Sequence, residues 1–371
     1  MTQSRNSKDP ATLALHADDG IEDAPDVAPP LHSATTYRAT TYRAGDPGDN
    51  AAGNPNSMVY GREETVTRRR LEAVLGALEG GHAVTYASGQ AAAHAALLHC
   101  HPRRVAIEGG YHGTHALLEA FGDGGLEVVG LDASLDEGDL VWLETPRNPT
   151  CVVEDIAAHV QRAHRAGARV LVDSTFATPV LQQPLTLGAD LVMHSSTKFL
   201  GGHSDAMGGV LSTADAAQAD ELRRQRTVFG AVPGALECWL TLRSLRTLSL
   251  RVTRQSDSAT AIAAWLEGRV PKVWHPSLPG HPGYETAQRQ MRGPGGVLSI
   301  ELADEASARA LPGRLRLFSD ATSLGGVESL IEWRRRYDPN APDTLLRISI
   351  GLEATADLIA DLERGLEGLS R

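Results

Sequence analysis

The sequence VLVDSTFATP occupies residues 170–179, and MHSSTKFLGGHSDAMGG occupies residues 193–209. The apolar run 170–172 is short and rich in valine, and it ends on Asp173, which is typical of a buried parallel strand. A second apolar run, 191–193, leads to three hydroxyl residues and then to Lys198. Because ligands bind at the carboxyl ends of strands in open α/β sheets, we expect these polar groups to meet in one crevice.

The chemistry of these side chains indicates a cofactor. A desolvated lysine amine forms a Schiff base with a carbonyl compound, and hydroxyls beside backbone N–H groups bind phosphate. A carboxylate keeps a pyridine nitrogen protonated. Pyridoxal 5'-phosphate (PLP) requires all three functions at once. The alternative is a loop rich in serine and threonine with a solvated lysine.

Both motifs resemble the cofactor-lysine region of the trans-sulfuration enzymes, a PLP-dependent family of cysteine and methionine metabolism, and the resemblance extends over residues 29–369. It implies an α/β protein of the fold-type I PLP-dependent transferase class, with a mainly parallel central sheet in a large domain and a smaller C-terminal α/β domain. It also implies that Lys198 carries PLP, that Asp173 meets the pyridine nitrogen, and that Ser195 and Thr197 hold the phosphate.

Composition restricts the classes of partner. The formal net charge of −11 argues against nucleic acid, because a duplex binder needs a basic face. The three cysteines are widely spaced, which indicates reduced thiols and no metal site. Neither a signal sequence nor an apolar run of membrane-spanning length is apparent. We therefore predict a cytoplasmic protein without a nucleic-acid or membrane partner. The resemblance implies that it acts on a small-molecule amino-acid substrate.

The chain length of 371 residues predicts more than one domain. Residues 1–57 are rich in Pro, Gly, Asp, Asn and Thr and predict an extended N-terminal arm, with a disordered tail through Asp26 as the alternative for its first part. We place a large PLP-binding domain at 58–250 and a small C-terminal domain at 251–371. An apolar stripe over 236–252 predicts one long helix linking them.

Residues 60–62 read YGR and precede a predicted helix. In the family a Tyr-x-Arg motif reaches the cofactor phosphate of a neighbouring subunit, so the resemblance assigns this role to Tyr60 and Arg62. A surface salt bridge is the alternative for the arginine. The resemblance further implies active sites shared between subunits of a homotetramer, built as a dimer of dimers. The following residues, 63–67, depart from the family pattern.

Three further motifs follow predicted strands. Residues 88–90, SGQ, join a strand at 83–87 to a helix at 91–98, and such a helix N-terminus binds anions, so Gly89 and Gln90 are expected to donate backbone N–H groups to phosphate. The resemblance places Tyr111, after the strand 104–107, against the PLP ring; an ordinary amphipathic tyrosine is the alternative. It also places Asn148, in ETPRNPT at 144–150, at the ring hydroxyl.

Two sites fall in the predicted small domain. Arg347, in LLRISIGLE at 345–353, resembles the arginine that binds the substrate α-carboxylate. Ser323, in ATSLGGVES at 321–329, resembles a residue that lies near the cofactor lysine and lines the substrate pocket. Two departures stand out: Thr322 replaces a frequent glutamate, and EWRRRY at 332–337 replaces a segment with proline, methionine and histidine. Its three arginines are expected either to meet an acidic substrate tail or to form a solvated run.

The function implied is elimination or replacement at Cγ of a sulfur amino acid or an activated homoserine, as in cystathionine γ-lyase or γ-synthase. Alternatives are a cystathionine β-lyase or an O-acetylhomoserine sulfhydrylase. Methionine γ-lyases usually carry cysteine at the position of Gly113, which argues against methionine as the substrate. Less favoured are an aminotransferase and a non-catalytic PLP-binding protein.

Overall fold

The structure is a computed structural model that describes residues 8–21, 26–37, 58–122 and 124–369. Its larger sheet has seven strands in the order β1-β7-β6-β5-β4-β2-β3. Strands β6, β5, β4, β2 and β3 are parallel, and β7 runs antiparallel to both of its neighbours, which confirms the mainly parallel sheet. The strands are β1 His82–Tyr86, β2 Arg104–Ile107, β3 Glu127–Val129, β4 Leu140–Glu144, β5 Arg169–Asp173, β6 Leu191–Ser195 and β7 Gly209–Thr213.

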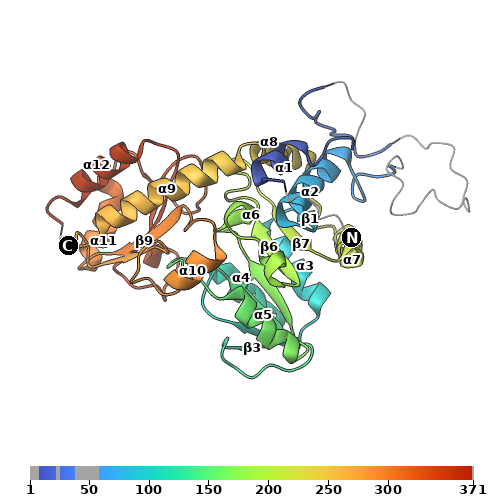
Figure 1. Ribbon diagram of the computed structural model, residues 1–371, viewed down its shortest axis with the longest axis horizontal. Coiled ribbons are helices and arrows are strands. Elements are labelled where there is room, and N and C mark those ends of the chain that lie inside the picture. The colour runs from blue at the N-terminus through green and yellow to red at the C-terminus, as the bar shows by residue number, and fades with distance from the viewer. Residues whose placement is uncertain (1–7, 22–25, 38–57, 123, 370–371) are drawn as a thin grey trace, which may run out of the picture.

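A second sheet of five strands, in the order β10-β11-β12-β9-β8, lies at the opposite end of the molecule (Figure 1). Its apolar residues form a core of their own with the helices α9, α11 and α12, which confirms a second, smaller α/β unit. The strands are β8 Lys272–Trp274, β9 Val297–Glu301, β10 Ser319–Asp320, β11 Leu330–Trp333 and β12 Leu345–Ser349.

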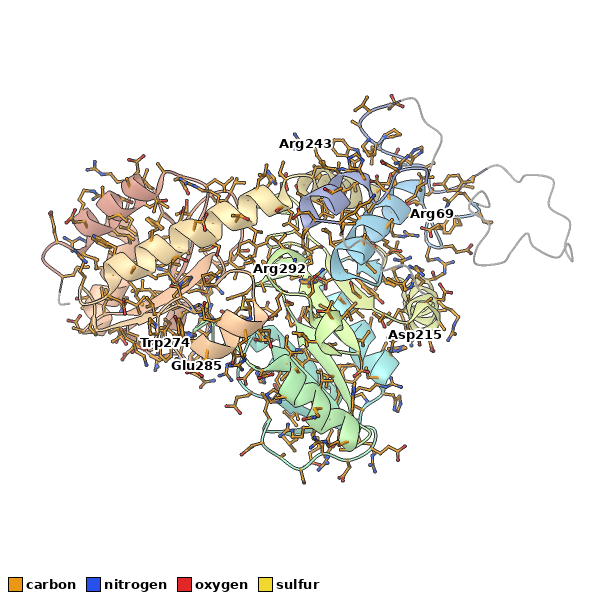
Figure 2. The ribbon with its side chains drawn as sticks, in the orientation of Figure 1. Arg69, Asp215, Arg243, Trp274, Glu285 and Arg292 are labelled. Carbon is orange, nitrogen blue, oxygen red and sulfur yellow. The ribbon has the colours of Figure 1, made fainter. Side chains whose placement is uncertain are left out.

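Several helices begin with a polar N-cap residue. Ser88 caps α3 by accepting a hydrogen bond from Ala91 N, and Asp215, labelled in Figure 2, caps α7 in the same manner. The α-helices are α1 Pro10–His16, α2 Val66–Glu79, α3 Gly89–Cys100, α4 His112–Gly122, α5 Ile156–Arg165, α6 Thr178–Leu181, α7 Ala216–Phe229, α8 Ala235–Leu245, α9 Leu248–Leu266, α10 Tyr284–Gln290, α11 Glu305–Arg314 and α12 Thr355–Leu366. The 3₁₀ helices are η1 Pro184–Leu187 and η2 Arg334–Arg336. None of the helices in the described ranges combines the length and the apolarity needed to cross a membrane.

The prediction of one long helix over 236–252 is wrong, because the chain breaks between α8 and α9. The last turn of α8 tightens, with Arg246 N donating to Arg243 O, and Thr247 has a non-helical backbone conformation. Helix α9 extends across both units (Figure 1). Val252 packs in a core of the large unit, and Ile262 packs in the core of the second sheet. The predicted domain boundary at 250 falls in the first turn of α9.

The prediction of an extended arm is wrong for the first part of the N-terminal segment. Asp9 and Pro10 begin helix α1, which packs against α2 and α9. Just after α1, Asp18 is buried and accepts hydrogen bonds from the guanidinium groups of Arg70 and Arg246. This buried ion pairing explains why the polar segment is ordered. Residues 38–57 of the predicted arm lie outside the described residues.

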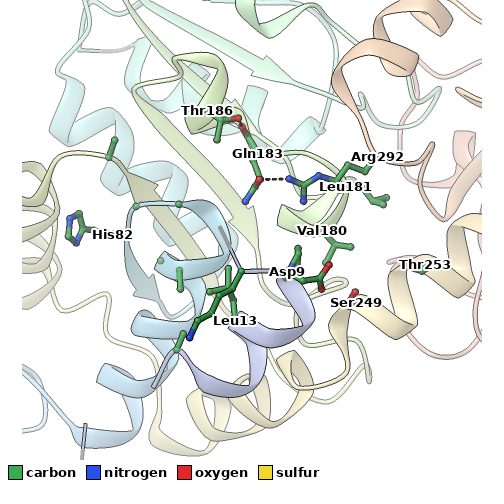
Figure 3. Close-up of a pocket in the computed structure, with 18 residues that line it drawn as sticks. Asp9, Leu13, His82, Val180, Leu181, Gln183, Thr186, Ser249, Thr253 and Arg292 are labelled. Atoms are coloured by element: carbon green, nitrogen blue, oxygen red, sulfur yellow. Dashed lines mark hydrogen bonds between the residues drawn. The ribbon is translucent and has the colours of Figure 1, made fainter. Parts of the chain in front are cut away.

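Beside α1 lies a cavity of about 1150 Å³, lined by residues of α1, α2, α6 and α9, among them Leu13, Val180 and Thr253 (Figure 3). Arg292 and Gln183 join by a hydrogen bond of 2.7 Å at its wall (Figure 3). None of the candidate site residues lines this cavity.

Candidate active site

A different cavity, of about 480 Å³, brings together most of the predicted site residues. It lies where the carboxyl ends of β4, β5 and β6 meet the loop before β11 and the strand β12. Ten predicted residues line it, and Tyr60 and Arg62 do not. The ten are Gly89, Gln90, Tyr111, Asn148, Asp173, Ser195, Thr197, Lys198, Ser323 and Arg347.

Lys198 follows β6 in a tight turn, in which Lys198 N donates to Ser195 O. Its Nζ donates a hydrogen bond of 2.7 Å to Ser323 Oγ. Burial lowers the pKa of the Lys198 amine to about 8, and the nearby positive charge of Arg347 acts in the same direction. A neutral and therefore nucleophilic amine is accordingly accessible near neutral pH.

Two buried carboxyl groups lie side by side in the cavity. Glu144 and Asp173 end the parallel strands β4 and β5 and are paired in register. Burial, together with the Asp173 carboxyl, raises the pKa of Glu144 to about 8. Burial also raises the pKa of Asp173, although two hydrogen bonds from Thr175 oppose this. An acid in such a place is suited to pairing with a cationic group of a ligand.

Thr175 links the Asp173 carboxyl to Ser195 at the end of β6. Its Oγ1 donates to Asp173 Oδ1 at 2.5 Å and accepts from Ser195 N at 2.9 Å. On the other side, a Cβ at Gly89 would lie 3.0 Å from Ser195 Cβ, so glycine allows the N-terminus of α3 to approach Ser195 closely. Thr197 Oγ1 accepts a hydrogen bond of 3.1 Å from Gly208 N. Helix N–H groups and two hydroxyl residues thus form a cradle that fits a phosphate group.

Arg347 enters the cavity from β12 and has three partners. Its guanidinium donates to Asn148 Oδ1 at 3.0 Å, to Ser323 O at 3.0 Å and to Glu332 Oε2 at 2.8 Å. Burial lowers the pKa of Arg347 to about 10, so the group stays charged at neutral pH. A fixed, buried guanidinium is suited to binding a carboxylate.

Tyr111 lines the cavity and is 40% exposed. Its backbone N–H donates to Glu144 Oε2 at 2.7 Å, and a Cβ at Gly113 would lie only 2.4 Å from its ring. Gln90 stands nearby, and its Nε2 donates to Gly113 O at 2.8 Å. The absence of a side chain at 113 therefore leaves the tyrosine ring room over the turn.

Tyr60 and Arg62 lie outside this cavity, on the surface. The guanidinium of Arg62 lies 5.7 Å from the centre of the Tyr60 ring and donates to Thr227 O at 3.1 Å. Their predicted role concerns a neighbouring subunit, and it stays a prediction.

Sequence reasoning gave no role to three residues that line or support the cavity, which are Glu144, Thr175 and Glu332. Glu144 satisfies the same strand-end rule that selected Asp173, so the signal was present. Thr175 and Glu332 act through hydrogen bonds that sequence spacing does not reveal. Arg334, one of the three arginines for which the sequence left two alternatives open, lines the cavity from η2.

A desolvated lysine beside buried carboxyl groups and a phosphate cradle is the arrangement of a PLP-dependent enzyme. The comparisons agree with this class. The chain belongs to the Cys/Met metabolism PLP-dependent enzyme family, whose sequence model matches residues 11–367.

Related proteins carry several activities. The chain is 40% identical over 383 residues to cystathionine gamma-synthase of Mycobacterium tuberculosis, covering 96% of each protein. It is 37% identical over 361 residues to cystathionine beta-lyase of Lactococcus lactis subsp. cremoris, covering 90% of this chain and 94% of the relative. It is 34% identical over 385 residues to cystathionine gamma-lyase of Bacillus subtilis, covering 96% of this chain and 99% of that protein.

Solved structures show the same fold. The crystal structure of metB from Corynebacterium glutamicum has a TM-score of 0.90 and 34% identity, covering 97% of this chain and 98% of that one. Cystathionine gamma lyase CalE6 from Micromonospora echinospora has a TM-score of 0.88 and 37% identity, covering 97% of this chain and 100% of that one. The fold-type expectation and the PLP cofactor are thereby confirmed.

Proposed function

We propose that the protein catalyses PLP-dependent elimination or replacement at Cγ of a sulfur amino acid or an activated homoserine. The observation that carries this proposal is the shared cavity of Lys198, Asp173 and Arg347, in which an amine, a ring-binding acid and a carboxylate-binding cation converge. The relatives named cystathionine gamma-synthase and gamma-lyase support the choice of Cγ.

Each predicted residue has a task in this proposal. Lys198 holds PLP, Asp173 keeps its ring nitrogen positively charged, and Asn148 hydrogen-bonds the ring hydroxyl. Ser195, Thr197 and the N-terminus of α3 at Gly89 and Gln90 bind the phosphate. Arg347 binds the substrate α-carboxylate, with Ser323 beside it. When bound, PLP supplies an electron sink that stabilises negative charge at the substrate carbon atoms.

Proton transfers fall to two side chains of this chain. The Lys198 amine, once free, moves protons at Cα and Cβ of the substrate, because its lowered pKa allows it to act as a base and as an acid near neutral pH. The phenol of Tyr111, which lines the cavity, transfers a proton at the leaving group or the incoming nucleophile.

Attack at Cβ is a second candidate, because the cystathionine beta-lyase of Lactococcus lactis is 37% identical to this chain. An O-acetylhomoserine sulfhydrylase is a further alternative within the same chemistry. An aminotransferase would convert its donor to a keto acid without releasing a thiol or ammonia. A non-catalytic PLP-binding protein would turn over nothing.

A product assay on L-cystathionine separates these functions. We expect the purified holoenzyme to release cysteine, 2-oxobutyrate and ammonia, which reports cleavage at Cγ. Homocysteine with pyruvate and ammonia would instead report cleavage at Cβ. Parallel assays with O-acetylhomoserine plus a thiol, and with methionine, test the remaining alternatives. Absence of product from all of these substrates would overturn the proposal.

We also propose a cytoplasmic homotetramer whose active sites are shared between subunits. The free cysteines support a reducing compartment: Cys151 and Cys238 are buried, and no disulfide joins the described cysteines. The placement of Arg62 outside its own cavity supports sharing of sites.

A further inference from the structure

Glu144, the last residue of β4, has both of its carboxyl oxygens engaged by backbone N–H groups. Oε1 accepts a hydrogen bond of 2.8 Å from Asn148 N, and Oε2 accepts one of 2.7 Å from Tyr111 N. The residue is buried, at 8% exposed, and it lines the active-site cavity together with Tyr111 and Asn148. One carboxyl group therefore contacts the backbone of two residues to which the proposed function gives a task at the cofactor.

These two residues lie in different segments of the chain. Tyr111 follows β2, and Asn148 lies in the turn after β4. The two strands are parallel neighbours, so both segments leave the sheet at the same edge, and the last pair of their ladder is Ile107 with Trp142. Glu144 connects the segments beyond the point where the ladder has ended.

The turn before Tyr111 leaves room for the carboxyl group. Gly110 has a positive φ of 93°, which favours glycine, and a Cβ there would lie only 2.6 Å from Glu144 Oε2. A side chain at this position would push the carboxyl group away from Tyr111 N. The side chain of Asn148 is held separately, because its Oδ1 accepts a hydrogen bond of 3.0 Å from Arg347. Glu144 thus fixes the backbone that carries this side chain.

The charge on Glu144 depends on its neighbour Asp173. Burial and the Asp173 carboxyl raise the pKa of Glu144 to about 8, whereas the two N–H donors favour the ionised form. An ionised carboxylate accepts such hydrogen bonds more strongly than a neutral acid does. A positive charge paired with Asp173 reduces the repulsion between the two carboxyl groups, so it favours ionised Glu144 and strengthens both bonds.

We propose that Glu144 is a positioning residue, whose two hydrogen bonds hold Tyr111 and Asn148 where they reach the cofactor. This inference rests on the proposed function and adds to it a residue that acts through these two neighbours. A residue that only stabilised the fold would not selectively change the setting of the bound cofactor or kcat.

Hydrogen–deuterium exchange of the holoenzyme measures the two bonds. Glutamine offers one carbonyl oxygen and presents an NH₂ group to the second N–H, so Glu144→Gln keeps at most one of them. In at least one of the peptides that cover residues 108–115 and 145–152, we expect an amide that exchanges at least about tenfold faster than in the wild type. Peptides from the antiparallel strand β7 should exchange as in the wild type.

The bound cofactor reports the positions of Tyr111 and Asn148. Glu144→Gln should still bind PLP at Lys198, but the visible circular dichroism band of the bound cofactor should lose intensity, because an ordered chiral setting around the ring produces this band. We expect kcat to fall at least about tenfold, since small displacements of positioned groups are costly. KM should stay within about threefold, because Glu332 and Ser323 O still hold Arg347 in place.

Glu154→Gln is the matched control. Glu154 is another carboxyl residue that follows β4, and it pairs with Arg147 at 3.7 Å and with His159 at 3.5 Å without lining the cavity. Its exchange, dichroism and kcat should equal those of the wild type. Glu144→Asp is a second variant, which retains the acid but is one methylene too short to keep both bonds. It should show the same losses, so the test remains informative if Glu144→Gln fails to fold.

Unchanged exchange in both peptides would overturn the proposed hydrogen bonds. Faster exchange with unchanged dichroism and kcat would overturn the positioning role, because it would show that the bonds serve only the fold. Exchange and dichroism require no substrate. Losses in both, without product from any sulfur substrate in the wild type, would therefore support the role of Glu144 and contradict the proposed function alone.

Discussion

Nζ of Lys198 donates a hydrogen bond of 2.7 Å to Oγ of Ser323, a residue 125 positions further along the chain. The first follows a strand of the large sheet, and the second lies in the loop before β11 of the small sheet. Ser323 has a positive φ of 84°, and its carbonyl is held by Arg347 at 3.0 Å. The position of the lysine amine therefore depends on both units.

This setting predicts an unusual pH dependence for attachment of the cofactor. Because burial and Arg347 lower the pKa of Lys198 to about 8, the neutral amine is abundant at mildly alkaline pH. The rate at which the apoenzyme attaches PLP should rise with a midpoint near pH 8. Stopped-flow absorbance in the visible range, followed by borohydride fixation and peptide mass analysis, measures this rate and its site.

Two variants check the cause. Lys198→Ala should abolish the fixed link at this peptide. Arg347→Met removes a positive charge and leaves Glu332 paired with Arg334, so the midpoint should move to higher pH. A wild-type midpoint near 10.5, the ordinary value for lysine, would contradict the desolvated amine.

Close packing at the phosphate cradle gives a second prediction. In Gly89→Ala the new Cβ would lie 3.0 Å from Ser195 Cβ and 3.1 Å from its Oγ, so Ser195 must move out of the cradle. We expect the dissociation constant for PLP to rise at least about tenfold, or 1.4 kcal/mol. Fluorescence titration of the apoenzyme measures it.

Gly122→Ala is the matched control, since Gly122 ends a helix and its added Cβ would meet nothing within 4 Å. Its PLP affinity should equal that of the wild type. An unchanged affinity in Gly89→Ala would mean that the phosphate does not depend on contact between α3 and Ser195.

The sequence predicted what depends on local pattern. Asp173 was identified because an apolar run ends just before it, and Lys198 because it follows a second apolar run closely. The structure places Asp173 at the end of β5 and Lys198 in the turn after the neighbouring parallel strand β6. The break between α8 and α9 escaped prediction because the apolar stripe continues across Arg246 and Thr247. Helix α1 escaped because its order depends on burial of Asp18 against distant arginines.

The directions of the side chains in EWRRRY, residues 332–337, could not be predicted from the sequence for a different reason. Composition left open whether the three arginines meet an acidic substrate tail or the solvent, and the structure turns them in different directions. Arg334 turns inward because Glu332, two residues earlier on β11, is buried and offers it an ion pair, whereas Arg336 finds Asp320 outside. The direction of each arginine side chain is set by tertiary contacts, and residue spacing does not predict these contacts.

A buried charge network beneath β1 predicts a large effect on stability. Although burial alone raises the pKa of Glu72, its pairing with Arg226 and Arg223 lowers that pKa to about 2. Glu72→Gln leaves the fully buried Arg226 without its counter-charge, and we expect a loss of about 3 kcal/mol in the free energy of unfolding. Urea unfolding at pH 7 measures the loss.

The sign of the pH effect follows from the lowered pKa. The stabilisation from Glu72 is complete above its unfolded value of 4.5 and is lost as the pH falls from 4.5 toward 2, so the variant should lose less stability than the wild type over that range. Arg224→Gln, which removes an exposed pair with Glu221 at 3.2 Å, should cost less than about 1 kcal/mol. Equal losses in the two variants would be inconsistent with a structural role for the buried network.

Shared active sites predict complementation between inactive subunits. Arg62 is exposed and absent from the cavity of its own chain, where Lys198 lies. If Arg62 binds the phosphate in a neighbour's site, a hybrid of Arg62→Ala and Lys198→Ala subunits contains one site with both residues intact. Random exchange of subunits should then restore about a quarter of the wild-type activity, because half of the dimers are hybrids and each has one complete site.

The matched control mixes Lys198→Ala with Asp173→Ala. Both of these residues line one chain's own cavity, so every site in the hybrid lacks one of them and no activity should return. Native mass spectrometry of subunits with different masses establishes that exchange has occurred. Hybrids that form in the expected proportion but remain inactive in the Arg62→Ala mixture would show that Arg62 serves the surface and not a neighbour's cofactor.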